Sequence, residues 1–317
     1  MKTPKRYLVP ADFMADPSVH VWDGKVYIYP SHDWEPEDFV ENDNGDHFNM
    51  KDYHVFSLNG NDPMTAEVID HGKVLDVADI PWAGRQLWDC EVARKDGKYY
   101  MYGTRANTFG QKTKGLDVYV STDLVNWSEP IECFNSEKYN MNSNVNWAPE
   151  VHKYKDAYYM FATFTKPNGL RGTYILKSDT PSGEFKPHSK GAVTPEEWEC
   201  LDGTFYIDKN NKPFIIFCHE HTQVIDGTIC YAELNDDLTE IVGEAVTMFA
   251  GSEPFFIKKA PDDGHFVTDG PFMYRSKTNE LFMLWSTFIN HQYAECLVKF
   301  NDGELNMNFT HLDPLID

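Results

Sequence analysis

The chain has 317 residues and a formal net charge of −22, and 41% of its residues are hydrophobic. That hydrophobic fraction supports a buried core and excludes a disordered chain. The negative charge makes nucleic acid and acidic membranes poor partners, because phosphate binding requires clustered Lys and Arg. A neutral glycan is compatible with this charge.

The start of the chain, MKTPKRYLVP, is charged and then interrupted by proline, unlike a secretory leader. No apolar run reaches the roughly 20 residues that a membrane-spanning helix needs. The cysteines show neither metal-site nor disulfide spacing, and most lie in apolar segments where Cys acts as a small hydrophobe. We therefore expect reduced thiols and a cytoplasmic protein.

Five times along the chain, a short polar motif precedes an apolar, aromatic-rich strand. The second residues of these motifs are Asp16, Asp89, Ala148, Asp202 and Asp269. The following strands are predicted at 26–29, 99–102, 158–161, 214–217 and 281–284. Third strands are predicted at 53–58, 116–121, 173–178, 228–234 and 295–300. Turn residues such as Asp23-Gly24 separate them, a pattern typical of hairpins.

Repeats of this length are typical of propeller blades. We predict an all-β, five-bladed β-propeller that forms a single domain over residues 1–317. The approximate blades are 11–80, 81–140, 141–195, 196–260 and 261–317. A propeller must close its ring, so residues 6–10 are expected to pair with the last blade and cover its edge strand.

Carboxylates at the heads of the innermost strands of a propeller would converge on its central axis. The predicted rim residues are Asp16, Asp89, Asp202 and Asp269. Glu91 and Glu150 lie two residues further along their strands and are expected to face the same way. Crowded carboxylates repel each other and separate their pKa values, which provides an acid and a base at one pH. Glycosidic hydrolysis needs such a pair. The alternative for each Asp alone is a turn-capping role.

Aromatic side chains near these motifs predict a sugar-binding site. Trp88 and Trp147 directly precede their motifs and are candidates for stacking on a sugar ring, with core packing as the alternative. His219 follows an apolar strand and is a candidate to hydrogen-bond sugar hydroxyls, or a structural histidine. The expected partner is a small-molecule or oligosaccharide substrate.

An acidic insertion at 33–48 is interpreted as a solvated loop. Its residues Asp43, Asn44 and Asp46 offer the oxygen ligands of a structural Ca²⁺ site as a less favoured alternative. No other metal and no cofactor is expected.

Several of these segments together resemble glycoside hydrolase family 43. ADPSVHVWDGKVYIYPSHD at 15–33 resembles a first blade of that family, and NWAPEVHKYKDAYYMFATF at 146–164 closely resembles its WAPEV blade. Residues 200–220 and 267–288 resemble later blades. The resemblance implies inverting, metal-independent hydrolysis of arabinose- or xylose-containing glycans. It also implies an Asp base, an Asp that orients substrate and tunes pKa, and a Glu general acid.

Two alignments with the family pattern stay open. If the pattern starts at Asp16, Ala148 stands where the orienting Asp belongs. If it starts one blade later, the pattern fits better: Asp89 is the base, residues 147–150 form the second blade, Asp202 is the orienting residue and Asp269 the acid. Asp202 falls on a family acid position in both alignments. The first blade resembles one branch of the family and the others another, as in a natural mosaic or an engineered chimera.

The departures from the pattern leave competing interpretations. Asp269 reaches about one methylene less far than the Glu of the family. A catalytically weak or inactive propeller that only binds sugar is therefore an alternative. A retaining, invertase-like fructosidase is a less favoured one, loosely matched by Asp16, Asp89 and the pair Glu199-Cys200.

Overall fold

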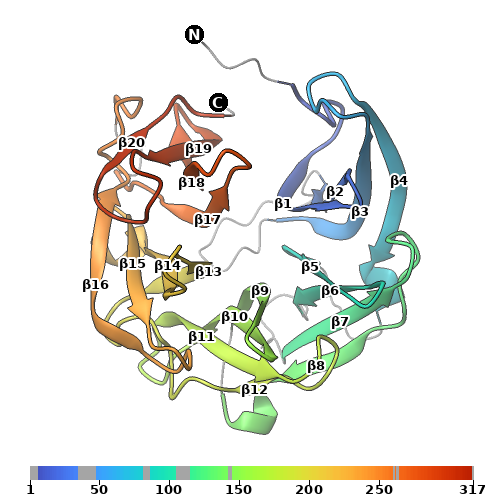
Figure 1. Ribbon diagram of the computed structural model, residues 1–317, viewed down its shortest axis with the longest axis horizontal. Coiled ribbons are helices and arrows are strands. Elements are labelled where there is room, and N and C mark those ends of the chain that lie inside the picture. The colour runs from blue at the N-terminus through green and yellow to red at the C-terminus, as the bar shows by residue number, and fades with distance from the viewer. Residues whose placement is uncertain are drawn as a thin grey trace. The chain divides into compact units, whose positions relative to one another are not determined.

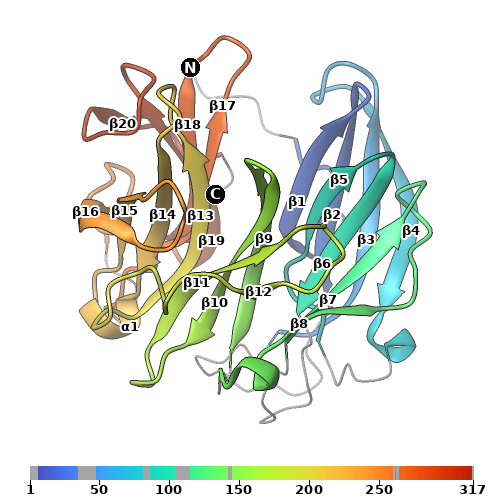
Figure 2. The same ribbon diagram turned by 60° about the horizontal axis from the view of Figure 1, so that its bottom comes forward.

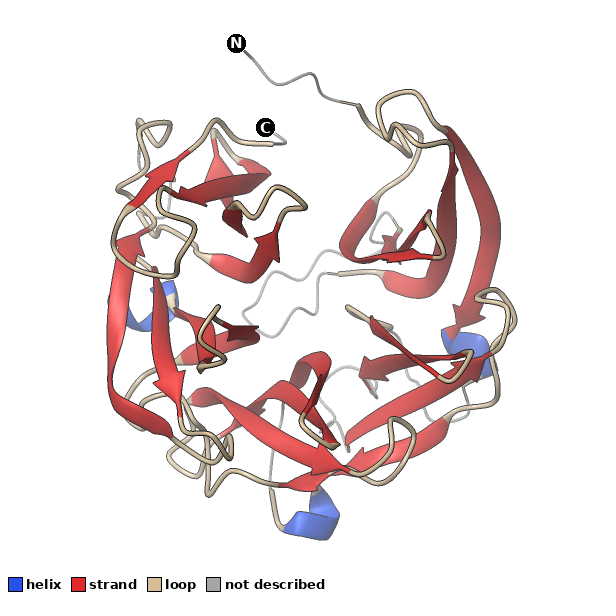
Figure 3. Ribbon diagram, in the orientation of Figure 1, coloured by secondary structure: helices blue, strands red, loops and turns tan. Residues whose placement is uncertain are grey.

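The computed structural model describes residues 6–34, 48–80, 86–104, 115–141, 145–259, 261 and 264–315. In these ranges the chain forms twenty strands, two 3-10 turns and the four-residue helix α1 (His221–Val224). Strands therefore dominate the described structure (Figure 3). None of its helices has the length and apolar character that crossing a bilayer would take.

The strands form five four-stranded sheets, each made from consecutive strands (Figures 1 and 2). The first sheet contains β1 (Met14–Trp22), β2 (Lys25–Asp33), β3 (Met50–Asn59) and β4 (Glu67–Asp76). The second contains β5 (Glu91–Lys95), β6 (Lys98–Thr104), β7 (Gly115–Ser121) and β8 (Ile131–Asn135). The third contains β9 (Asn146–Tyr154), β10 (Ala157–Thr165), β11 (Arg171–Ser178) and β12 (Lys186–Pro187).

The fourth sheet contains β13 (Cys200–Ile207), β14 (Pro213–His219), β15 (Thr228–Leu234) and β16 (Ile241–Ala250). The fifth contains β17 (Asp269–Arg275), β18 (Leu281–Ile289), β19 (Gln292–Phe300) and β20 (Phe309–His311). Neighbouring strands run antiparallel in the first, fourth and fifth sheets, and likewise in the second. The predicted second and third strands of all five repeats are confirmed.

Local turn chemistry explains how these hairpins close. Asp23 (φ 52°) and Gly24 (φ 80°) join the paired residues Trp22 and Lys25. Asp96-Gly97 makes the same two-residue turn between β5 and β6, again with both φ angles positive. Only Gly, Asn and Asp adopt such angles readily, and this turn matches the twist of the flanking strands.

Two compact units make up the chain. Of the described residues, one unit comprises those within 6–160 and 177–186, and the other comprises those within 161–176 and 187–317. The first unit has a core beneath the first two sheets that includes Tyr29, Tyr53 and Met101, each completely buried. The second has a core beneath the fourth and fifth sheets that includes Ile216 and Trp285. The third sheet contributes residues to both units.

The N-terminal segment does not complete the last sheet, so that prediction was wrong. Residues 6–10 form no strand, and β20 supplies the fourth strand of the fifth sheet by pairing with β19. The guanidinium of Arg6 instead donates to the carbonyls of Pro63 (2.8 Å) and Ala66 (2.6 Å), before β4 of the first sheet. The outer edge of β19 is thus already covered by a segment close to it in the chain.

Candidate active site

Three of the innermost strands, β1, β13 and β17, carry a β-bulge at the predicted motifs. Two residues of the inner strand oppose one residue of its neighbour between Ala15 and Ser18 in β1, and the same occurs in β13 and β17. The first bulged residue has a positive φ in each case. These residues are Asp16 (47°), Asp202 (53°) and Gly270 (50°), and Ala148 (47°) has the same angle in β9. Bulges re-aim side chains and are frequent beside active sites.

This geometry changes which motif residues are equivalent. Asp16 and Asp202 occupy the same bulge position, as the sequence predicted. The equivalent position in β17 belongs to Gly270, so Asp269 lies one residue earlier, level with Ala15 and Leu201. A sequence signal for this register exists, because the second residue of each of the three bulges is Pro or Gly. These residues are Pro17, Gly203 and Pro271.

Asp16, Asp89 and Glu91 come together around Cys90 in the first unit. Burial raises the pKa of the Cys90 thiol, and the charges of all three carboxylates raise it further. Asp89 itself precedes β5 and lies outside any strand. The hydroxyl of buried Tyr53 donates to the carbonyl of Trp88, which fixes this segment to β3.

Glu91 is the centre of a polar network that the sequence analysis missed. The Ser18 hydroxyl donates to Glu91 Oε2 at 2.9 Å, and His20 Nε2 lies 3.3 Å from Glu91 Oε1. Ser18 Oγ and His20 Nε2 are themselves 3.0 Å apart. Ser18 and His20 are two residues apart in the regular part of β1 beyond the bulge, and this alternation was the signal available in the sequence.

Trp88 and Trp147 contact each other. Their rings meet edge to face with centroids 5.4 Å apart, and both residues are half-buried. Glu150 Oε1 lies 3.1 Å from His152 Nε2. Burial opposes protonation of His152, but the charge and hydrogen bond of Glu150, with a contribution from Glu91, raise its pKa overall. Glu150 is thus engaged with an imidazole that favours the protonated form.

Asp202 and Asp269 form a second group, in the other unit, around Cys218. Burial raises the pKa of the Cys218 thiol, and the charges of Asp202, Asp269 and Glu220 add to this. The backbone N–H of Gly270 donates to Asp202 Oδ2 at 3.3 Å. The hydroxyl of Tyr293, also missed in the sequence, donates to Asp269 Oδ2 at 2.6 Å.

His219 is held by its neighbours. Its ring stacks on Trp198 with centroids 4.3 Å apart, and its Nε2 lies 2.8 Å from Gln223 Oε1. Burial lowers the pKa of His219, which favours the neutral imidazole. These contacts orient the ring as part of the packing around Trp198.

A buried ion cluster lies beside this ring and was not predicted. Arg171 pairs through Nε with Glu199, and its Nη2 lies 3.2 Å from Glu220 Oε2. The charge of Glu220 also raises the pKa of Cys218, as do the charges of Asp202 and Asp269. The ion cluster therefore lies at the end of β14 that is near these two acids. Its burial and pairing indicate a supporting role.

One predicted feature lies outside the described residues, namely Asp43, Asn44 and Asp46 of the suggested calcium site.

Comparisons with known proteins show similarity to glycosyl hydrolases. The family model described as "Glycosyl hydrolases family 43" matches residues 78–299. A xylosidase/arabinosidase from Bacteroides ovatus is 72% identical over 102 residues, which are 32% of this chain and 30% of that protein. Xylosidase/arabinosidase 43A from Humicola insolens is 59% identical over 318 aligned positions, covering 95% of this chain and 91% of the relative.

A solved structure shows the same fold. The endo-arabinase from Bacteroides thetaiotaomicron VPI-5482 is 33% identical, with a TM-score of 0.64 over 75% of this chain and 84% of that one. Together with five successive four-stranded sheets, this likeness confirms the predicted all-β, five-bladed β-propeller fold class.

Proposed function

This chain belongs to glycosyl hydrolase family 43 and is a glycosidase, and from that premise we propose that it hydrolyses xylose- or arabinose-containing glycans with inversion at the anomeric carbon. The substrate class is supported by the names of its relatives, a xylosidase/arabinosidase and an endo-arabinase. The net charge of −22 is compatible with a neutral oligosaccharide.

The shared bulge position of Asp16 and Asp202 carries the mechanistic proposal. In inverting hydrolysis, a carboxylate takes a proton from water while the water oxygen bonds to the anomeric carbon. A protonated carboxyl gives its proton to the leaving oxygen as the glycosidic bond breaks. We assign the base to Asp16, with Asp89 as the alternative in the same unit, and the acid to Asp202.

The remaining predicted residues have supporting roles in this proposal. The hydroxyl of Tyr293 orients Asp269 through a hydrogen bond. The charges of Asp269 and Asp202 both raise the pKa of the buried Cys218 thiol, so the two carboxylates are near each other. A negative charge near Asp202 would favour its protonated form, as a general acid requires. Trp88 and Trp147 are proposed to contact the sugar, because they directly precede Asp89 and Ala148 of the repeated motifs and their rings contact each other.

The test is hydrolysis of nitrophenyl arabinofuranoside, xyloside and galactoside by the wild type and by Asp202→Asn. We expect turnover of the first or second substrate, and a loss of at least 100-fold in kcat for the variant, because general acid catalysis contributes about 10²–10⁴-fold. Asp208→Asn is the matched control. Asp208 follows the same strand, β13, and accepts backbone N–H bonds of its own turn.

The outcomes distinguish the competing functions. Full activity of Asp202→Asn would remove Asp202 from the reaction. No turnover by the folded wild type would favour a sugar-binding propeller. This is the second candidate, because the positions with positive φ in β9 and β17 hold Ala148 and Gly270, which carry no carboxylate. The anomer that forms first, followed by proton NMR, separates inversion from the retaining, invertase-like alternative.

A further inference from the structure

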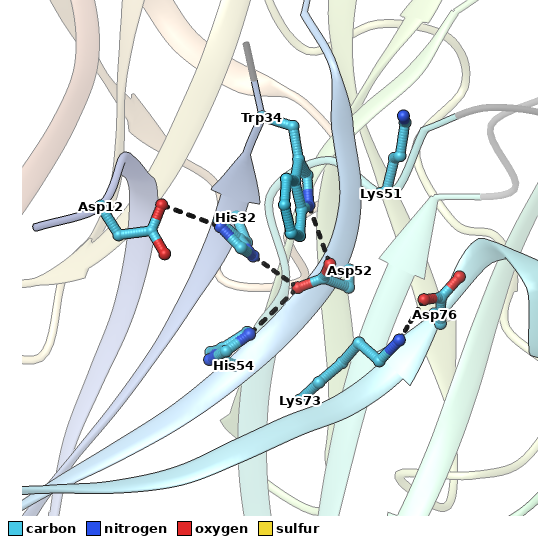
Figure 4. A pocket seen from close by; sticks show the side chains of 8 residues that line it. All are labelled: Asp12, His32, Trp34, Lys51, Asp52, His54, Lys73 and Asp76. Atoms are coloured by element: carbon cyan, nitrogen blue, oxygen red, sulfur yellow. Dashed lines mark hydrogen bonds and ion pairs between the residues drawn. The ribbon is translucent and has the colours of Figure 1, made fainter.

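A second cluster of ionisable side chains lies at one end of the first sheet, among residues that the proposed reaction does not use. His32 is on β2, and Asp52 and His54 are on β3 (Figure 4). The ladder between β2 and β3 pairs His32 directly with Asp52, and Asp52 and His54 are two residues apart on the same face. His32 is 3% exposed and Asp52 is 2% exposed, so both polar groups are removed from bulk water.

The atoms of this cluster are spaced like the ligands of one metal ion. Asp52 Oδ1 lies 2.8 Å from His32 Nδ1 and 3.3 Å from His54 Nε2. One ligand atom from each residue falls within 4.8 Å of the others. A metal ion with bonds of about 2.0–2.2 Å to nitrogen and oxygen holds neighbouring ligands about 3 Å apart in octahedral and about 3.4 Å apart in tetrahedral geometry.

The groups behind these ligands complete the pattern. His32 Nε2 lies 3.0 Å from Asp12 Oδ1, and His54 Nδ1 lies 3.6 Å from Asp70 Oδ1. Metal-binding histidines commonly direct their second nitrogen at a carboxylate, which fixes the tautomer and makes the ligand more basic. The indole N–H of Trp34 donates to Asp52 Oδ2 at 3.0 Å, so the carboxylate is oriented as well.

The cluster opens onto a cavity of about 420 Å³ that has room for an ion and its waters. Two lysines line the same cavity, and both carry a charge that a bound cation would oppose. Lys73 forms an ion pair with Asp76. The Asp52 carboxylate contacts the imidazoles of His32 and His54 and the indole of Trp34 (Figure 4). The carboxylates of Asp12, Asp52 and Asp76 around the cavity outnumber the ammonium groups of Lys51 and Lys73.

We propose that His32 Nδ1, Asp52 Oδ1 and His54 Nε2 bind a divalent cation of the Zn²⁺ type, with water in the remaining positions. Two imidazole nitrogens and one carboxylate suit a borderline metal such as Zn²⁺ better than Ca²⁺, which prefers six or more oxygens. The ion would join β2 to β3. Through Asp12 it would also hold the segment that enters β1 four residues before Asp16.

The test is calorimetric titration of the chelator-treated full chain with Zn²⁺, together with visible spectra in Co²⁺. We expect one equivalent of Zn²⁺ and a Co²⁺ ligand-field band in the wild type. His54→Gln should lower the Zn²⁺ affinity at least 10-fold and abolish the band. His71→Gln is the matched control and should change neither, because His71 lies on β4 of the same sheet and contacts Ser57 instead.

A second variant protects the test against a folding defect. Asp12→Asn leaves all three ligands in place and should weaken Zn²⁺ binding about 10- to 100-fold, as losses behind the ligands do. Wild-type protein that binds no stoichiometric Zn²⁺ would overturn the proposal, and so would equal affinity in His54→Gln and the wild type. Neither result bears on glycoside hydrolysis, because binding is measured without substrate.

Discussion

Asp16 and Asp89 are two single residues that the sequence left as alternative bases. The charges of both carboxylates raise the pKa of the buried Cys90 thiol, so nearness to this thiol does not distinguish the two residues. Asp16 alone lies on a bulge with positive φ, the geometry that it shares with Asp202. We therefore expect Asp16→Asn to lower kcat/KM by at least 100-fold and Asp89→Asn by less than 10-fold, within the range of general base catalysis.

Steady-state kinetics on the best nitrophenyl substrate check this expectation, with circular dichroism to verify folding of each variant. The opposite ranking would identify Asp89 as the base. The family pattern would then start at the second sheet, and Asp202 would become the orienting residue.

The short strand β20 carries a buried histidine, His311, that makes the stability of the folded chain depend on pH. His311 lies against Phe249 and Phe309, with ring centroids 4.6 Å and 5.6 Å away. Burial lowers the pKa of His311 to about 4. The unfolded chain, where a histidine pKa is about 6.5, therefore binds this proton before the folded chain does. Stability from this group is present above pH 6.5 and is lost as the pH falls toward 4.

His311→Phe should remove this dependence while keeping the aromatic packing of β20. Relative to the wild type, we expect the variant to gain unfolding free energy as the pH decreases from 7 to 5, measured by urea denaturation at both values. A difference between the two proteins that does not vary with pH would contradict the assigned burial.

Elements with local signals were predictable from the sequence, and features that depend on pairing between distant segments were not. Asp23-Gly24 and Asp96-Gly97 mark their hairpins because few other residues adopt both positive angles. Asp269 was placed one residue out of register because the sequence motifs were aligned on their acidic residues. In β17 the bulge is formed by Gly270 and Pro271, which come after Asp269. The His32–Asp52 contact joins residues 20 apart and has no motif.

The acidic sites show the same division. Grouping Asp16, Asp89 and Glu91 was possible because each stands at the start of a repeat. His20 and Tyr53, which interact with these acids, lie in strands with no distinctive sequence motif. Only the packing of neighbouring strands shows that they are close to the acids. The network around Glu91 therefore could not be read from its own motif.

At the scale of the whole molecule, the net charge of −22 is the dominant electrostatic property. Like charges on the folded surface repel each other, and unfolding relieves part of this repulsion because the chain expands. Salt screens such exposed charges, and the Debye length falls from about 30 Å at 0.01 M to about 8 Å at 0.15 M ionic strength. The folded state should therefore gain stability over this range.

We expect the melting temperature to rise when NaCl is increased from about 0.01 M to about 0.15 M, where screening changes most. The KM for a neutral nitrophenyl glycoside should stay within about twofold, because no net charge steers that substrate to the protein. Differential scanning fluorimetry and initial rates measure the two quantities on one preparation. A melting temperature that falls with salt would mean that attractive ion pairs, such as Arg171 with Glu199 and Glu220, outweigh the general repulsion.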